Sequence, residues 1–295
     1  MITDNSNIEL SLTGRIRAYA KLMKPRLTFL VMFSSTVGFM LATTHRINII
    51  DFILFNLAGF LVTTSSNAIN QIIEVDIDKL MKRTAKRPLP LGAISQQEAK
   101  LFAFFSGAFG ILLMYTCFNL NASLLCLLSL VLYAFVYTPL KTRHPIAVFV
   151  GAIPGALPPM IGWVAVNNKF GWEPGILFAI QFVWQFPHFW AIAWVLDDDY
   201  KKAGIRLLPG SGKDIKTAFQ IMIYTLLLIP LGCVPNMIGM AGKTSMIIAI
   251  VCGTLFLAQT FYLMKECSNK AARQIMFGSF LYLPIVQIAF VLDKL

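Results

Sequence analysis

Two short clusters of acidic residues have the residue types and spacing that could do chemistry. Six of the fourteen Asp and Glu residues lie in them: Glu74, Asp76 and Asp78 in the first, and Asp197, Asp198 and Asp199 in the second. If one helix runs through the first cluster, Asn70, Glu74 and Asp78 share a face, about 6 Å apart per step. Stacked carboxylates repel each other unless a cation lies between them. Oxygen ligands of this kind favour Mg²⁺ or Ca²⁺ over zinc.

Basic residues follow both acidic clusters: Lys82, Arg83 and Arg87 after the first, and Lys202 after the second. Mg²⁺ usually binds through one or two carboxylates plus substrate phosphates, and nearby Lys and Arg side chains meet the remaining negative charge. The pattern therefore predicts a diphosphate site. The alternative is that each cluster is a solvated helix end.

The elements that must position these clusters are membrane-spanning helices. Of the 295 residues 57% are hydrophobic and 13% are charged, whereas about 25% are charged in a soluble domain. A span needs about 20 apolar residues. We expect an all-α integral membrane protein in which residues 1–295 form a single domain with nine transmembrane helices, preceded by a cytoplasmic segment at 1–24. The expected spans are 26–44, 48–68, 101–119, 122–140, 145–166, 174–196, 217–238, 244–264 and 273–292.

The distribution of basic residues predicts the orientation of these spans. With the N-terminus in the cytoplasm, 21 of the 25 Lys and Arg residues fall in cytoplasmic segments, as the positive-inside rule requires. Both acidic clusters then lie at cytoplasmic helix ends. The topology also accounts for the net charge of +11, so no nucleic-acid partner is expected.

The chain resembles the intramembrane prenyltransferases of the UbiA superfamily in its nine spans and two motifs, Asn70-xxx-Glu74-xxx-Asp78 and Met81-Lys-Arg83-Thr84. It is similar to the haem-farnesylating branch of that superfamily in two further segments, Trp184-Gln-Phe-Pro187-His188-Phe189 and Gly155-Ala156-Leu-Pro158-Pro159. The resemblance extends from about residue 20 to 290.

This resemblance implies a Mg²⁺-dependent reaction in which farnesyl diphosphate loses pyrophosphate and its farnesyl group joins the 2-vinyl group of haem b. A hydroxyl from water ends on the adjacent carbon, which gives haem O for haem A and terminal oxidase biogenesis. Haem b is then a substrate and not a resident cofactor. A multi-pass protein of the bacterial inner membrane with a cytoplasmic active site is implied. Haem A synthase or an oxidase assembly factor would be a partner besides the lipid bilayer.

The resemblance also assigns the metal ligands to Asn70, Glu74, Asp78 and Asp199. The superfamily usually has Asp where this chain has Glu74, and Glu coordinates Mg²⁺ with a longer reach. The second superfamily motif is usually Asp-xxx-Asp, and alignment on Asp199 places Val195 at its first position. Asp198 is the expected substitute for that missing carboxylate.

His188 is the histidine with an expected function, because a histidine inside an apolar span needs a partner. It could ligate haem iron, act as a base, or make a helix–helix hydrogen bond. Lys141 and Arg143 could meet haem propionates or diphosphate. Aromatic faces could stabilise an allylic cation, and the available rings are Tyr133, Tyr137, Phe182, Trp184, Phe186, Phe189 and Trp190.

Two other functions remain open on the sequence alone. A polyprenyltransferase acting on an aromatic or quinone precursor would use the same fold. A transporter would place charged residues on both sides of the midplane or have paired broken helices, whereas these acids cluster on one side.

Overall fold

The computed structural model describes residues 11–210 and 212–295. The first ten residues of the predicted N-terminal segment lie outside this range. The described part is helical apart from its connections and one isolated bridge between Ala241 and Lys294. Four short helices are α1 (Leu12–Met23), α4 (Val75–Leu80), the π-helix η1 (Leu132–Tyr137) and α7 (Thr138–Leu140).

Nine helices in the described residues are long and apolar enough to span a membrane, which confirms the predicted fold class. They are α2 (Pro25–Ala42), α3 (Ile49–Ile73), α5 (Gln96–Cys117), the segment Leu120–Leu140 that begins with α6 (Leu120–Val131), α8 (Ala147–Asn167), α9 (Trp172–Lys202), α10 (Ile215–Met237), α11 (Lys243–Glu266) and α12 (Asn269–Leu292). Predicted and observed ends agree within about five residues, except that α9 continues through its acidic cluster to Lys202.

Polar caps fix where several of these helices begin. Ser95 and Glu98 form a capping box at the start of α5, and Asn119 accepts a hydrogen bond from the backbone N–H of Ala122 at the start of α6. Such caps pair backbone N–H groups that have no partner in the first helical turn. They define the residues at which α5 and α6 begin.

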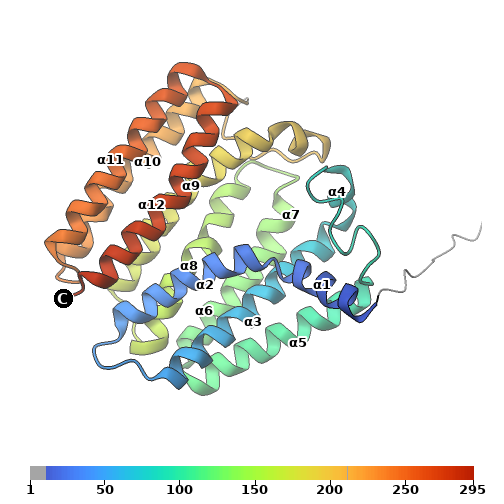
Figure 1. The fold of residues 1–295 in the computed structure, drawn as a ribbon, viewed down its shortest axis with the longest axis horizontal. Helices are drawn as coiled ribbons and strands as arrows, with labels where there is room; N and C mark the ends of the chain where they lie inside the picture. The colour runs from blue at the N-terminus through green and yellow to red at the C-terminus, as the bar shows by residue number, and fades with distance from the viewer. Residues whose placement is uncertain (1–10, 211) are drawn as a thin grey trace, which may run out of the picture.

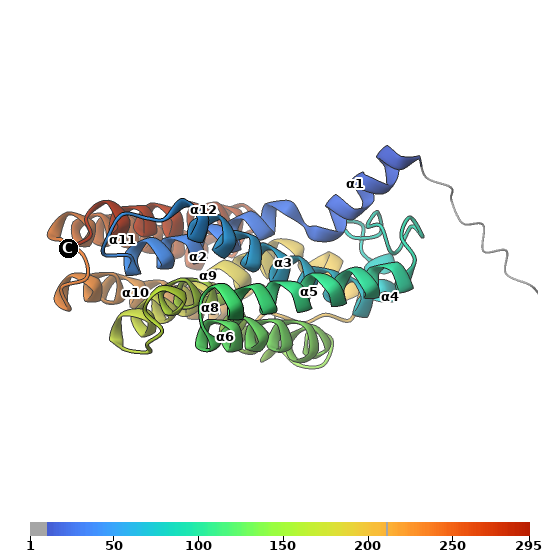
Figure 2. The same cartoon turned by 90° about the horizontal axis from the view of Figure 1, so that it is seen from below.

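Consecutive spans lie side by side, and the series closes into a ring where α12 returns to contact α2 (Figure 1). Contacts of α8 with α2 and of α9 with α12 cross the interior of the ring. The short helices α1, α4 and α7 gather at one end of the molecule, and α1 projects beyond the bundle (Figure 2). That end contains the first acidic cluster.

Glycines bring α2 and α8 into backbone contact. A Cβ atom added to Gly38 would lie 1.9 Å from the carbonyl oxygen of Pro159, and one added to Gly162 would lie 2.0 Å from that of Ser35. No side chain fits at either position. Small residues of this kind let membrane helices approach closely.

Neighbouring helices satisfy two backbone carbonyls that prolines leave unpaired in α8. Pro158 and Pro159 lack an N–H, so the carbonyls of Pro154 and Gly155 lose their helical partners. Ser129 of α6 donates to the Pro154 carbonyl at 3.4 Å, and Gln181 of α9 donates to the Gly155 carbonyl at 2.8 Å. Proline is tolerated in membrane helices where neighbouring helices pair the freed groups in this way, and α8 is helical from Ala147 to Asn167.

Candidate active site

The predicted stripe of Asn70, Glu74 and Asp78 lines one cavity. We expected a continuous helix, but α3 ends at Ile73 and α4 begins at Val75. The break is one residue long and keeps the helical hydrogen bonds from Glu74 N–H to the Asn70 carbonyl and from Asp78 N–H to the Glu74 carbonyl. The three side chains therefore stay on one face and are at most 5% exposed. Asp76 points away from this face and pairs with Lys79.

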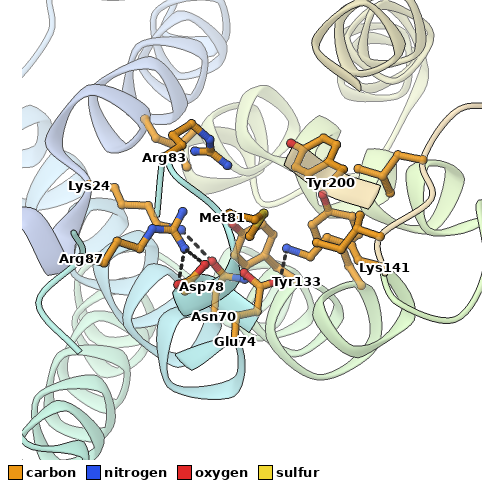
Figure 3. Close-up of a pocket in the computed structure, with 14 residues that line it drawn as sticks. Lys24, Asn70, Glu74, Asp78, Met81, Arg83, Arg87, Tyr133, Lys141 and Tyr200 are labelled. Carbon is orange, nitrogen blue, oxygen red and sulfur yellow. Dashed lines mark hydrogen bonds and ion pairs between the residues drawn. The ribbon is translucent and has the colours of Figure 1, made fainter. Parts of the chain in front are cut away.

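Each side chain of this stripe has a cationic partner (Figure 3). Arg87 donates to both carboxylate oxygens of Asp78, at 2.8 and 2.6 Å. Lys141 forms an ion pair with Glu74, and the Lys24 ammonium donates to Asn70 Oδ1 at 2.6 Å. Figure 3 shows Arg87 and Lys141 reaching the acidic groups from opposite sides.

The cavity has a volume of about 270 Å³ and an excess of positive charge. Four cationic side chains line it, namely Lys24, Arg83, Arg87 and Lys141, against the two carboxylates of Glu74 and Asp78. Arg83 makes no ion pair within the described part of the chain. Even with Lys24 left out of the count, cationic side chains outnumber carboxylates in this small cleft, which favours an anionic ligand.

The donor set of this cavity also fits Mg²⁺. No group of three or more His, Cys, Asp or Glu residues converges as a metal cage in residues 11–210 and 212–295. Mg²⁺ does not need such a cage, because it commonly binds one or two carboxylates and takes its other ligands from substrate phosphates and water. Glu74 and Asp78 supply two carboxylates, and the Asn70 amide oxygen lies beside them.

Lys24 is a cavity residue that sequence reasoning missed. It ends α1 in a left-handed conformation (φ 51°) and precedes Pro25, so the chain turns there and the side chain points inward. Burial, together with the nearby Arg87 and Lys141, lowers its pKa well below the ordinary value. The Lys-Pro pair directly before the first span was the available signal that the chain turns at Lys24, because the α-helical conformation is disfavoured for a residue that precedes proline.

A second, larger cavity adjoins the first. It has a volume of about 450 Å³ and mostly apolar walls from α2, α3, α8, α9 and α12. Leu27, Tyr133 and Tyr137 line both cavities, so the charged and apolar spaces share a wall. The two tyrosines come from η1, and π-helical turns frequently occur at functional sites.

His188 lies in the wall of the apolar cavity and not among the acids. Its Nδ1 atom lies 2.9 Å from Ser279 Oγ, and its ring stacks on Trp184 with centroids 4.4 Å apart. Trp184 donates from Nε1 to the Ser279 carbonyl at 3.0 Å. Contacts with α12 thus fix the orientation of both rings.

The predicted aromatic residues divide into two groups. Tyr133, Tyr137, Trp184 and Phe189 line the apolar cavity. The others, Phe182, Phe186 and Trp190, contact further rings such as Phe149 and Tyr224 in the packing around α9.

Five predicted site residues line neither cavity: Lys82, Arg143, Asp198, Asp199 and Lys202. Asp199 accepts a hydrogen bond from the Lys82 backbone N–H at 3.1 Å, so the second cluster contacts the loop after α4. Asp198 faces outward near Lys213, because adjacent residues point in different directions around a helix. Tyr200, which follows Asp199 along α9, lines the charged cavity instead.

Comparisons with known proteins identify the family. The model of the UbiA prenyltransferase family matches residues 31–283. Among curated relatives, the protoheme IX farnesyltransferase of Cytophaga hutchinsonii is 59% identical over 285 residues, which cover 96% of this chain and 100% of that protein. The protoheme IX farnesyltransferase of Christiangramia forsetii is 43% identical over 281 residues, which cover 94% of this chain and 93% of that protein.

Solved structures show the same fold. A structure described in connection with digeranylgeranylglyceryl phosphate synthase has a TM-score of 0.79 and 22% identity, covering 95% of this chain and 98% of its own. A UbiA homologue from Archaeoglobus fulgidus bound to GPP and Mg²⁺ has a TM-score of 0.65 and 20% identity, covering 93% of this chain and 99% of its own. Taken with the family match, these findings establish that the chain belongs to the UbiA prenyltransferase family.

Proposed function

We propose that this protein transfers the farnesyl group of farnesyl diphosphate to the 2-vinyl group of haem b, with release of pyrophosphate. The observation that carries the proposal is a cationic cavity that shares a wall with a larger apolar one. This pairing suits a substrate with a diphosphate at one end and a hydrocarbon chain at the other. The relatives named protoheme IX farnesyltransferase, which match over nearly the whole chain, support haem as the acceptor.

The cationic residues of the first cavity bind and orient the diphosphate in this proposal. Arg83 is available for this role because it has no ion pair within residues 11–210 and 212–295, whereas Arg87 and Lys141 neutralise Asp78 and Glu74 until an anion enters. Charge-assisted hydrogen bonds from Arg and Lys to phosphate are among the stronger polar contacts in proteins. They also stabilise the negative charge that grows on the leaving group as the C–O bond breaks.

Asn70, Glu74 and Asp78 are the residues that would hold Mg²⁺, which supplies additional charge neutralisation for the leaving pyrophosphate. The Archaeoglobus fulgidus homologue bound to GPP and Mg²⁺ supports a divalent ion in this fold. Asp199 contacts the loop after α4 and not the cavity, so we assign it to positioning that loop.

The shared wall separates the charged groups from the space for the farnesyl chain. Tyr133 and Tyr137 present aromatic rings 5.6 Å apart at this boundary. Aromatic faces stabilise a delocalised allylic cation electrostatically. The apolar walls beyond them exclude bulk water, which would otherwise quench that cation.

The direct test is to incubate the purified protein in lipid nanodiscs with haem b, farnesyl diphosphate and Mg²⁺ and to analyse the pigments by mass spectrometry. We expect a farnesylated, hydroxylated haem that is absent after Mg²⁺ chelation and returns when Mg²⁺ is added. Product formed only with a phenolic acid in place of haem b would contradict the acceptor. Full turnover in excess chelator would contradict the metal.

Arg83→Ala is expected to raise the KM for farnesyl diphosphate about tenfold, the effect of losing one hydrogen bond to a charged group. The KM for haem b should change little. Arg143→Ala is the matched control, because Arg143 is exposed and does not line the cavity. Equal KM values for the two variants would argue that Arg83 serves only membrane topology.

We also propose that the charged cavity opens to the cytoplasm of a bacterial cell, in the inner membrane. With nine spans, 21 of 25 basic residues fall on the side of the N-terminus. The cavity lies at the end where α1 and α4 gather. A Lys82→Cys variant treated with a membrane-impermeant thiol reagent would test this orientation, because Lys82 is exposed. We expect labelling in permeabilised cells and none at this position in intact cells.

A further inference from the structure

Two polar groups that α9 presents to the apolar cavity have no hydrogen-bond partner within residues 11–210 and 212–295. They are the carboxamide of Gln185 and the Nε2 atom of His188, one helical turn apart on α9. Gln185 is only 5% exposed. Leaving a buried carboxamide unpaired is costly, so a polar ligand or a water molecule is expected to complete this part of the cavity.

The hydrogen bonds around His188 define which ring nitrogen carries the proton. Ser279 donates its hydroxyl hydrogen to the Met276 carbonyl at 2.6 Å, so its oxygen accepts from the imidazole. His188 Nδ1 therefore holds the hydrogen, and Nε2 keeps a free lone pair. Stacking on Trp184 and the edge of Phe280 hold the ring in place.

Glycine residues of α8 set the depth of the Gln185 carboxamide. A Cβ atom on Gly155 would come within 2.6 Å of Gln185 Nε2, and one on Gly151 within 2.6 Å of the Tyr137 ring. Gly151 and Gly155 are one helical turn apart, about 6 Å. The carboxamide is thus one turn deeper than Tyr137, which borders the charged cavity.

The proposed reaction, on which this inference rests, needs a water molecule at a defined place and time. The vinyl π electrons form a C–C bond to the farnesyl carbon, and pyrophosphate leaves with the electrons of the broken C–O bond. Positive charge remains on the vinyl carbon attached to the porphyrin. Water must reach that carbon but must not reach the farnesyl group earlier. An apolar cavity holds ordered water only where several polar groups bind it.

We propose that Gln185 and His188 bind the water that supplies the hydroxyl group of the product. The water oxygen bonds to the cationic carbon, one of its O–H bonds breaks, and the proton passes to the Nε2 lone pair of His188. The Gln185 carboxamide orients the water. Ser279 and Trp184 act through the imidazole and are positioning residues.

Product composition tests this proposal. The purified protein is incubated with both substrates and Mg²⁺ in heavy-oxygen water, and the haems are separated and weighed by mass spectrometry. Wild-type product carries the labelled hydroxyl. Without a bound water the cation loses a proton instead, so the coupled product is an alkene that is lighter by one water.

Gln185→Leu is expected to raise the ratio of alkene to hydroxylated product about tenfold, the effect of one lost hydrogen bond. His188→Leu should raise the ratio of alkene to hydroxylated product further, on the order of a hundredfold, because it also removes a general base. Gly155→Ala displaces the carboxamide without altering its chemistry and should shift the ratio in the same direction. Gln259→Leu is the matched control, since that amide lies against Gly278 of α12 and outside the cavity.

Each contrary outcome has a separate meaning. An unchanged product ratio in Gln185→Leu and His188→Leu would overturn the water site and leave the proposed function intact. Loss of both coupled products in a folded variant would also overturn it, because water capture follows C–C bond formation. Absence of any farnesylated haem with the wild-type protein would overturn the proposed function itself.

Discussion

Asp78→Asn is expected to lower kcat for pyrophosphate release by on the order of a thousandfold. Asp78 is fully buried, and its carboxylate accepts two hydrogen bonds from Arg87. The amide has the same shape but no charge, so it binds a divalent cation poorly and leaves Arg87 without its counter-ion. Removal of one electrostatic contact to a developing charge typically costs about 10²–10³ in kcat. Asparagine rather than alanine avoids a cavity at this site.

Asp76→Asn is the control for that variant. It lies two residues away on the same helix, but its side chain is 86% exposed and pairs with Lys79. Exposed pairs of this kind contribute little to stability, so wild-type turnover is expected. Thermal unfolding of both variants in detergent would establish that they are folded. Wild-type kcat in a folded Asp78→Asn protein would contradict the role assigned to the acidic stripe.

Gly38→Ala is expected to lower the free energy of unfolding by about 3 kcal/mol, the upper end of the usual cost of overpacking. The new methyl group would lie 1.9 Å from the Pro159 carbonyl oxygen, and a backbone atom cannot move aside as a side chain can. The helices α2 and α8 must separate. Since Leu30 and Ser34 of α2 and Gly155 of α8 line the apolar cavity, its shape changes too.

Gly59→Ala is the matched control for this packing prediction. A methyl group there meets the thioether end of Met32 at 2.7 Å, and methionine side chains adapt readily. Its unfolding midpoint should stay near that of the wild type, whereas the midpoint of Gly38→Ala should fall. Equal midpoints would mean that the α2–α8 contact tolerates a wider spacing.

The spans and the acidic stripe were predictable because each depends on a local regularity. Apolar length alone defines a membrane helix, and the four-residue spacing of Asn70, Glu74 and Asp78 places them on one face. The one-residue break at Glu74 preserves that spacing through its backbone hydrogen bonds, so the prediction held although the helix is not continuous.

The remaining cavity residues depend on where distant segments meet, which no local pattern encodes. Lys24 enters through a left-handed turn, and Tyr200 enters because α9 presents that residue and not Asp199 to the cavity. Arg143 and Lys202 had the right charge, but Arg143 is exposed in the turn after α7 and Lys202 is exposed at the end of α9. Charge alone does not distinguish a residue that binds substrate from one that follows the positive-inside rule.

The π-helix η1 has a consequence for tolerated changes in chain length. Its wide turn lets Thr138 donate to the Tyr133 carbonyl at 2.8 Å while accepting from Asn70 at 3.2 Å. Deleting one residue between 133 and 138 would leave Thr138 four residues after Tyr133, which is the spacing of an ordinary α-helical hydrogen bond. Thr138 and Lys141 would then keep their rotational position relative to Asn70 and Glu74, whereas the same deletion within the regular helix α6 would rotate them by about 100°. The wide turn is therefore a place where this segment can lose a residue with its functional side chains still aligned.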